Sequence, residues 1–158
     1  MSALARTVAA AALATALLAG CGRESSTPPQ HAANAAGPET KRSGDVTMTV
    51  SAIQTDKLPA QIVQRYGAPR DARTVLIVLS LRKGDDATSV ALSADQVQVT
   101  VSDLLGRKQQ IAMRPMRDGE LLDYVGTATI SPPETLRFDV VANTAHGRYP
   151  VQFNRDFF

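Results

Sequence analysis

Residues 96–103 read QVQVTVSD, and the alternation in this stretch decides the fold class. Val97, Val99 and Val101 recur at every second position, with polar side chains between them. Successive side chains of a β-strand point to opposite faces, so a period of two indicates a strand with one face in a core. The stretch therefore predicts a strand that is half buried.

Two segments upstream also favour strands. DVTMTVSA, residues 45–52, alternates in the same way. TVLIVLSL, residues 74–81, is apolar at nearly every position, which is typical of a central strand covered on both faces. The residues of the first segment that we expect to face the core are Val46, Met48, Val50 and Ala52.

Between these two strands, DKLPAQIVQRYG (residues 56–67) predicts the one helix of the chain. Asp56 is a candidate N-cap, Pro59 suits the first turn, and Gly67 suits the position after the helix end. We expect Ile62, Val63 and Tyr66 to form its apolar side.

Downstream of residue 103 the chain predicts successive hairpins. KQQIAMRPM (108–116) leads to a turn at Asp118-Gly119, a dipeptide that favours hairpins. Strands are then expected at LLDYVGTATI (121–130), which Ser131-Pro132-Pro133 ends, at TLRFDVVA (135–142), and, after a turn at His146-Gly147, at YPVQFNRDFF (149–158). The expected inward residues are Leu122, Tyr124, Gly126, Ala128, Ile130, Leu136, Phe138, Val140, Tyr149, Val151, Phe153 and Phe157. Because proline cannot donate to a strand ladder, Pro150 predicts an edge position for the last strand.

These patterns predict a mainly all-β domain over residues 44–158. We expect an immunoglobulin-like antiparallel β-sandwich of about seven strands, with one short helix between the first two. The chain has no Trp and a single Cys, so the buried Trp and the disulfide of antibody domains are absent.

The N-terminus predicts export and lipid attachment. Residues 1–20 have a basic start at Arg6 and an apolar run that is shorter than the roughly 20 residues of a membrane span. Leu18-Ala19-Gly20-Cys21 is similar to the bacterial lipobox, in which the cysteine is acylated after cleavage. The alternative is an ordinary secretory signal that happens to end near a cysteine.

The predicted location is the periplasmic face of the outer membrane. Several acyl chains on Cys21 would hold the protein stably to a bilayer. Gly22 follows the cysteine, in place of the Asp that resembles an inner-membrane retention signal. We therefore expect the membrane as a partner through the lipid anchor, and another envelope protein as a candidate partner.

Residues 21–43 are predicted to be the lipidated cysteine and a disordered tether, because 22–43 contain no Leu, Ile, Val or aromatic residue to bury. Removal of residues 1–20 takes away one of the 17 basic residues, and 16 then stand against 15 acidic ones. A chain with such a small net charge has no strong positive electrostatic potential to attract nucleic acid, so no nucleic-acid partner is expected.

The order of motifs resembles the bacterial family of the domain of unknown function 4426. The segments that carry the resemblance are IVQRYGAPRDARTVLIVLSLRKG (62–84), DGELLDYVGTATISPPETLRFDV (118–140) and VQFNRDFF (151–158). The family motifs match at Tyr66, Gly67, Arg70, Tyr124, Thr135 to Phe138, Phe153 and Phe157. The resemblance implies a β-sandwich in the cell envelope and no particular activity. This chain departs from the family pattern in its lipobox and long tether, where a plain cleavable signal would be expected.

From these motifs we take Tyr66, Arg70 and Tyr124 as candidate binding residues, and we add Arg155 for a separate reason. Arg155 falls between Phe153 and Phe157 on the face assigned to the core, where a charge needs a partner or must reach solvent. Asp103 is one candidate partner.

The sequence offers few residues that suit catalysis or metal binding. His146 is the only histidine of the domain and lies in a predicted turn, so we name no catalytic residue, no cofactor and no firm metal ligand. Met113, Met116 and His146 are weak candidates for copper, although Met113 and Met116 would face opposite sides of a regular strand. The function predicted from the sequence is a non-catalytic binding or protein-interaction module; periplasmic copper handling is the alternative, and an uncharacterised enzyme the third possibility.

Overall fold

The structure is a computed structural model that describes residues 37–85 and 87–158. This part of the chain contains ten strands and very little helix. The strands are β1 (Glu39–Ser43), β2 (Val46–Gln54), β3 (Thr74–Lys83), β4 (Val90–Ala91), β5 (Gln96–Asp103), β6 (Lys108–Ile111), β7 (Arg114–Asp118), β8 (Leu121–Thr129), β9 (Glu134–Thr144) and β10 (Gly147–Phe157). The helical elements are a 3-10 turn at Thr55–Lys57 and α1 (Ala60–Arg65).

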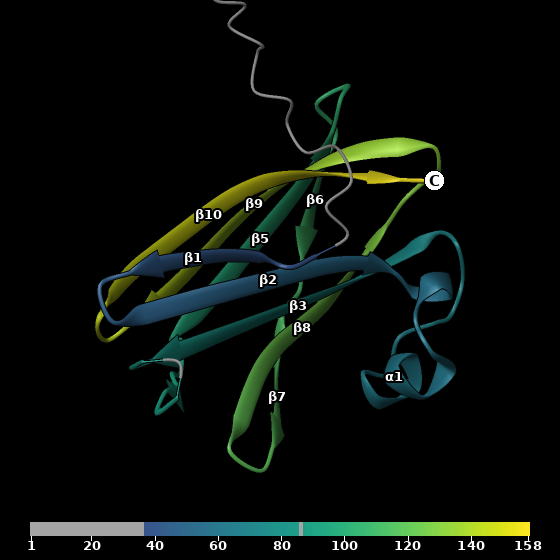
Figure 1. Cartoon of the computed structure of the whole chain (residues 1–158). Coiled ribbons are helices and arrows are strands. Elements are labelled where there is room, and N and C mark those ends of the chain that lie inside the picture. The colour runs from purple at the N-terminus through teal and green to yellow at the C-terminus, as the bar shows by residue number, and fades with distance from the viewer. Residues whose placement is uncertain (1–36, 86) are drawn as a thin grey trace, which may run out of the picture. The chain divides into compact units, whose positions relative to one another are not determined.

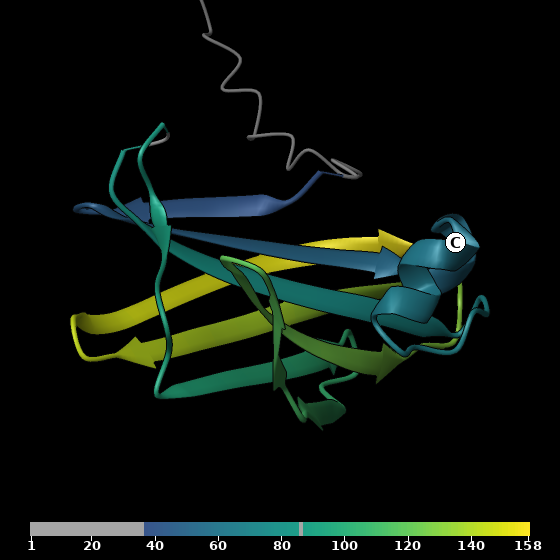
Figure 2. The same cartoon turned by 90° about the horizontal axis from the view of Figure 1, so that it is seen from below.

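The strands form two antiparallel sheets that face each other (Figure 1, Figure 2). The six-stranded sheet has the order β1-β2-β3-β8-β7, with β4 paired to β3, and the four-stranded sheet has the order β10-β9-β5-β6. At one side of the sandwich β1 and β2 contact β10 across the sheets. The prediction of an all-β sandwich is confirmed, although the described residues hold ten strands and not seven.

The core lies between the sheets and follows the alternation in the sequence. In β2 every second residue from Val46 is buried, and Val99 and Val101 of β5 are buried opposite them. Most of the residues that the sequence predicted to face the core belong to β8, β9 and β10. All of them are buried except Tyr149, which is partly buried against the core. The edge position predicted for the strand of Pro150 is also confirmed, because β10 ends the four-stranded sheet.

β3 is fully buried on its core face, and its outer face is buried at Leu76 and half-buried elsewhere, so the expected burial of both faces holds in part. Val75, Ile77, Leu79 and Leu81 face the core, whereas Leu76 points to the outer face and is only 3% exposed. Val125 on the neighbouring β8 and Val63 on α1 are also buried outside the main core cluster. α1 therefore packs a single buried residue, Val63, outside the main core.

The helix itself begins later than the sequence suggested. Asp56 lies in the 3-10 turn, and the N-cap of α1 is Pro59, with no side-chain cap. Proline disfavours helical backbone in the preceding residue, and Leu58 is extended, so the helix cannot start before Pro59. Gly67 follows the helix with φ +63°, as expected of a residue at that position.

The domain begins earlier than residue 44. Residues 39–43, which the sequence analysis places in the tether, form β1 and pair in register with β2 from Glu39↔Val50 to Ser43↔Val46. The strand cannot be recognised from its polar composition, because four of its five residues are exposed at a sheet edge. Only the backbone pairing with β2 defines it as a strand. Cys21, the signal at 1–20 and tether residues 22–36 lie outside the described residues.

The segment 108–116 is two strands and not one. β6 pairs with β5 in the four-stranded sheet, whereas β7 pairs with β8 in the six-stranded sheet. The chain crosses between the sheets at Ala112 and Met113. No helix within the described ranges is long and apolar enough to cross a membrane.

Candidate functional site

The crossing at Ala112–Met113 leaves part of β5 without a neighbour. β6 pairs only with Val99–Ser102, because its last residue, Ile111, lies opposite Val99. The next strand, β7, belongs to the other sheet. Within the described chain, residues 96–98 of β5 pair with β9 on one side and with no strand on the other.

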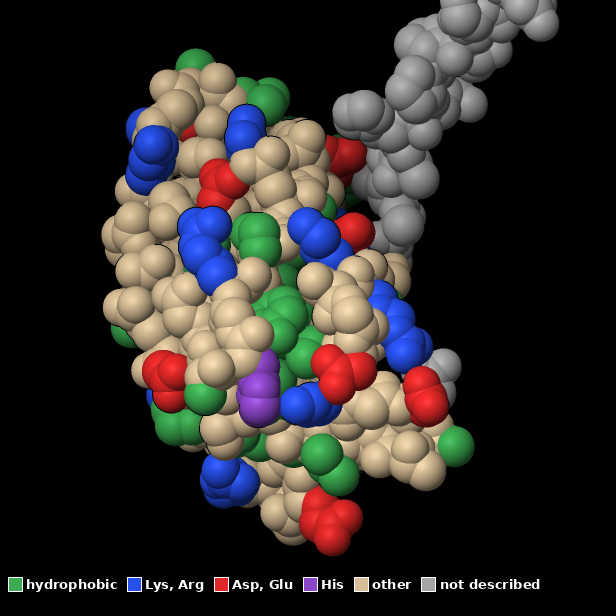
Figure 3. Space-filling model, turned by 90° about the vertical axis from the view of Figure 1, so that its left-hand side faces the viewer, with side chains coloured by type: hydrophobic (Ala, Val, Ile, Leu, Met, Phe, Trp, Pro, Cys, Tyr) green, Lys and Arg blue, Asp and Glu red, His purple; other side chains and the backbone are tan. Residues whose placement is uncertain are grey.

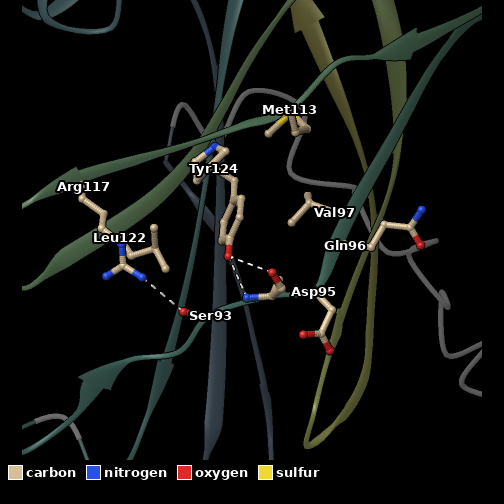
Figure 4. Close-up of a pocket in the computed structure, with 10 residues that line it drawn as sticks. Ser93, Asp95, Gln96, Val97, Met113, Arg117, Leu122 and Tyr124 are labelled. Carbon is tan, nitrogen blue, oxygen red and sulfur yellow. Dashed lines mark hydrogen bonds between the residues drawn. The ribbon is translucent and has the colours of Figure 1, made fainter.

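A hollow of about 490 Å³ lies beside this unpaired edge, and we call it the β5–β7 groove (Figure 4). Pro115 and Arg117 line it from β7, because they stand opposite Tyr124 and Leu122 of β8 and share their face. The full lining is Ser93, Ala94, Asp95, Gln96, Val97, Met113, Pro115, Arg117, Leu122 and Tyr124.

Tyr124 fixes the wall of the groove. Its ring is 7% exposed, and its hydroxyl accepts a hydrogen bond from the Ala94 N–H (2.7 Å) and donates one to the Ala94 C=O (3.2 Å). Figure 4 shows the ring reaching across the groove to this segment. Across the opening, Arg117 donates to the Ser93 hydroxyl at 3.4 Å. Hydrogen-bonding residues (Ser93, Asp95, Gln96 and Arg117) and apolar residues (Val97, Met113, Pro115 and Leu122) therefore line the groove together.

Of the other candidate binding residues, Tyr66 and Arg70 lie outside the groove. Tyr66 ends α1 and donates from its hydroxyl to Asp123 at 3.4 Å, and its carbonyl accepts a hydrogen bond from Arg114. Arg70 donates to the carbonyls of Leu58 and Asp56 and so holds the segment before α1. Both residues therefore join the helical segment to itself or to the sheet.

The surroundings of Tyr66 oppose its ionisation. Burial of the hydroxyl raises the pKa of Tyr66 above its ordinary value of 10.0, and the charge of Asp123 raises it further. Arg65 acts in the opposite direction and is outweighed. The pKa of Tyr66 is therefore higher in the folded chain than in the unfolded chain. The contribution of the protonated hydroxyl to the free energy of unfolding is fully present below the unfolded pKa, and it is lost as the pH rises through the folded pKa.

We expect Asp123→Asn to lower the pKa of Tyr66 toward its ordinary value, because the substitution removes the second largest cause of the shift. An absorbance titration of tyrosinate measures this, and a Tyr66→Phe chain identifies which of the three tyrosines is observed. Asp118→Asn is the matched control, since Asp118 is the smallest of the contributions. Equal titration curves for the Asp123→Asn chain and the unchanged one would contradict the assignment.

Arg155 has a different partner from the one that the sequence suggested. Asp103 hydrogen-bonds to Arg107, and Arg155 donates instead to the Gly37 carbonyl at 2.8 Å. The Arg155 guanidinium lies 5.6 Å from the centre of the Phe153 ring, a cation–π distance. Asp103 is drawn away because its own turn supplies the N–H groups of Leu105 and Arg107 as closer donors.

The candidate copper ligands do not come together. Met113 lines the groove, but Met116 stands opposite Asp123, so it faces the other side of the six-stranded sheet. His146 is exposed on the β9–β10 turn, at the end of the domain shown in Figure 3, where basic and acidic side chains are interspersed. Among the described residues no group of three His, Cys, Asp or Glu side chains could hold a metal ion.

Sequence reasoning missed most of the groove. It gave no role to residues 93–95 or to Arg117, and it treated Val97 only as a core-facing residue of its strand. The one signal was Pro115, which breaks the strand pattern of 108–116 next to the point where the chain changes sheets.

Comparison with known proteins agrees with the fold and the motif order. The family model described as "Domain of unknown function (DUF4426)" matches residues 40–158. The crystal structure of a DUF4426 family protein from Pseudomonas aeruginosa PAO1 is similar, with a TM-score of 0.62 at 20% identity, covering 77% of this chain and 95% of that one. A copper-bound variant of FetP from uropathogenic Escherichia coli strain F11 gives a TM-score of 0.50 at 9% identity, with the same coverage. No curated protein matches the sequence.

Proposed function

Because the chain belongs to the DUF4426 family, whose description gives no activity, we propose its function from its own features: a non-catalytic binding module of the cell envelope. In this proposal lipid on Cys21 holds the protein to the periplasmic face of the outer membrane. The lipobox-like Leu18–Cys21 supports the anchor, and the β5–β7 groove supports the binding role.

The observation that carries the binding role is the unpaired edge of β5 at residues 96–98. An extended polypeptide can add to such an edge through main-chain hydrogen bonds, while pockets for alternate side chains supply specificity. The position beside these residues is the one that β6 vacates when it leaves its sheet. A bound segment would therefore continue the line of β6.

The groove lining indicates what such a segment would carry. Val97, Met113 and Leu122 offer apolar surface for an inward side chain, and the Tyr124 ring lies beside them. Arg117 and Asp95, of opposite charge, stand at the rim. We propose an extended segment of an envelope protein that alternates apolar and polar residues, because its apolar side chains would enter the groove and its polar ones would stay in solvent.

The test is photo-crosslinking in living cells, with a photoreactive amino acid in place of Gln96. Gln96 is exposed and lines the groove, so we expect one specific adduct from this position. Gln152 is the matched control, since it is also an exposed glutamine of the four-stranded sheet but lies on β10, the opposite edge. Equal capture at both positions, or none at Gln96, would refute the groove as the binding site.

The same cells can carry a Cys21→Ala version, which tests the anchor independently. We expect this version in the soluble periplasmic fraction and the unchanged chain in the outer-membrane fraction. A Cys21→Ala chain that remains in the membrane fraction would contradict the anchor and leave the result at Gln96 intact.

Copper handling is the second candidate function. The FetP variant that shares this fold has copper bound, but likeness at 9% identity concerns the fold alone. Met113 supplies one soft ligand in the groove, and Met116 lies across the sheet from it. A Cu(I) titration of the purified chain beside its Met113→Leu variant separates this candidate from the first.

A further inference from the structure

An apolar patch lies at the end of the domain that holds the C-terminus. Leu104 and Leu105, in the β5–β6 turn, are 83% and 81% exposed, and the terminal Phe158 is 70% exposed. Together with Pro133 they line one shallow hollow of about 450 Å³, and we call these four residues the end patch. Large side chains gathered and exposed in this way usually mark an interaction surface.

The turn holds its two leucines outward. Asp103 accepts hydrogen bonds from the N–H groups of Leu105 and Arg107 and from the Arg107 side chain, and its own carbonyl accepts from Gly106. Gly106 has φ +81°, a conformation that glycine adopts without strain. The exposure of the leucines is therefore built into the turn.

The Asp103 carboxyl, although little exposed itself, is kept ionised by this network. Burial works to raise the pKa of Asp103, but the hydrogen bonds from Arg107 and Leu105 and the charge of Arg107 outweigh it, and the pKa is lowered from 3.8. The Asp103 carboxylate, which accepts the hydrogen bonds of the turn, thus stays charged at any pH above the ordinary range of a carboxyl group.

The described chain begins at the same end of the domain. Arg155 donates to the Gly37 carbonyl, and Arg155, Leu136 and Asp103 are register partners across β10, β9 and β5. Neighbouring strands are about 4.8 Å apart, so Arg155 and Asp103 are separated by only about 10 Å. Leu104 follows Asp103 directly, so the point where the chain leaves toward Cys21 lies close to the end patch.

We propose that the end patch rests on the lipid bilayer that holds the anchor, with Leu104, Leu105 and Phe158 against the membrane surface. This inference depends on the lipid anchor of the proposed function. Fifteen residues lie between Cys21 and Gly37, and even a fully extended chain over these sixteen steps spans no more than about 58 Å. The anchor therefore keeps this end of the domain within reach of the bilayer.

The charges beside the patch suit an interfacial position. Arg107 lies in the same turn, where it pairs with Asp103 and lies 4.0 Å from Glu134, and Lys108 opens β6 with its side chain exposed. Long basic side chains can keep their apolar stems at a membrane surface while the charged group reaches the headgroups. With the end patch on the bilayer, the β9–β10 turn at His146 would point away from it, because it lies at the far end of those strands.

The experiment uses the full lipidated chain in vesicles of phosphatidylethanolamine and phosphatidylglycerol that contain brominated lipid. Cys21 is the only cysteine and is acylated in this form, so Leu104→Cys provides a single thiol for an environment-sensitive fluorophore. Ala145→Cys, in the exposed β9–β10 turn, is the matched control. We expect bromine to quench the probe at 104 roughly threefold more than the probe at 145, since only the former would lie at the acyl boundary.

The outcomes separate the patch from the anchor. Vesicle flotation measures the anchor, and loss of co-flotation would overturn the anchor together with the docking. Co-flotation with equal quenching at 104 and 145 would overturn the docking alone. A blue-shifted probe at 104 that bromine does not quench would also overturn it, because a second copy of the chain would then cover the patch.

A second variant guards against an effect of the label itself. With the probe at Phe158→Cys, the pair Leu104→Ser and Leu105→Ser should bring quenching down to the level of the 145 control. Unchanged quenching would show that the leucines do not hold the domain to the bilayer.

Discussion

Phe138→Ala is expected to lower the free energy of unfolding by about 3–5 kcal/mol. Phe138 is 0% exposed and stacks on Phe153, with ring centres 4.8 Å apart and planes 3° from parallel. It also meets Phe157 edge-on at 6.3 Å. Removing the ring leaves a cavity where two aromatic contacts meet, and strands fixed by pairing on both sides cannot close it.

Urea denaturation of the two chains measures this difference. Phe158→Ala is the matched control, because the same ring at 70% exposure should change the stability by no more than about 0.5 kcal/mol. A loss below about 1 kcal/mol for Phe138→Ala would show that the core repacks around the gap, contrary to the expectation from a close-packed interior.

The alternation in the sequence was sufficient to predict the sandwich. A sheet face that packs on another must be apolar, and in β2, β5 and β9 the buried residues are the ones that recur at every second position. β3 was recognisable as central because Leu76 and Val78 make its outer face partly apolar as well, and Leu76 is buried. Burial leaves a pattern in the residues themselves, so it can be predicted locally.

The elements that could not be predicted are those defined by pairing without burial. β1 has the sequence ETKRS, which reads as a linker, and only its pairing with β2 makes it a strand. The change of sheet at Ala112–Met113 is marked in the sequence only by the nearby Pro115, because residues 108–116 otherwise read as one plausible strand. No local preference records which sheet a strand joins.

The candidate site was harder to predict than the fold for the same reason. Tyr124 was chosen from the motif order, and it does line the groove, but the groove exists because a strand is missing beside residues 96–98. An unfilled position in a sheet has no residues of its own. Arg155 likewise owes its surroundings to Gly37, a contact between residues 118 positions apart.

The last prediction concerns the point where the chain crosses between the sheets, at Ala112–Met113. Gly126→Ala should lower the free energy of unfolding by about 1–3 kcal/mol, although alanine is small. A Cβ at this position would lie 2.6 Å from Ile111 Cγ2, 2.6 Å from Met113 Sδ and 3.0 Å from the Ala112 carbonyl oxygen. The chain can pass from β6 to β7 so close to β8 only because residue 126 has no side chain.

Thermal or urea unfolding of four chains tests this as a double-mutant cycle: the unchanged chain, Gly126→Ala, Met113→Ala and the double variant. Met113→Ala removes the sulfur atom from the clash, so the two changes together should cost less than the sum of the single changes. Gly37→Ala is the control, because a Cβ there meets nothing within 4 Å and should leave the stability unchanged. Additive losses would mean that the Ile111 side chain or the Ala112 carbonyl, and not Met113, sets the limit at the crossing. A stability unchanged by Gly126→Ala would mean that the crossing has room to move, and the β5–β7 groove could then not be a preformed site.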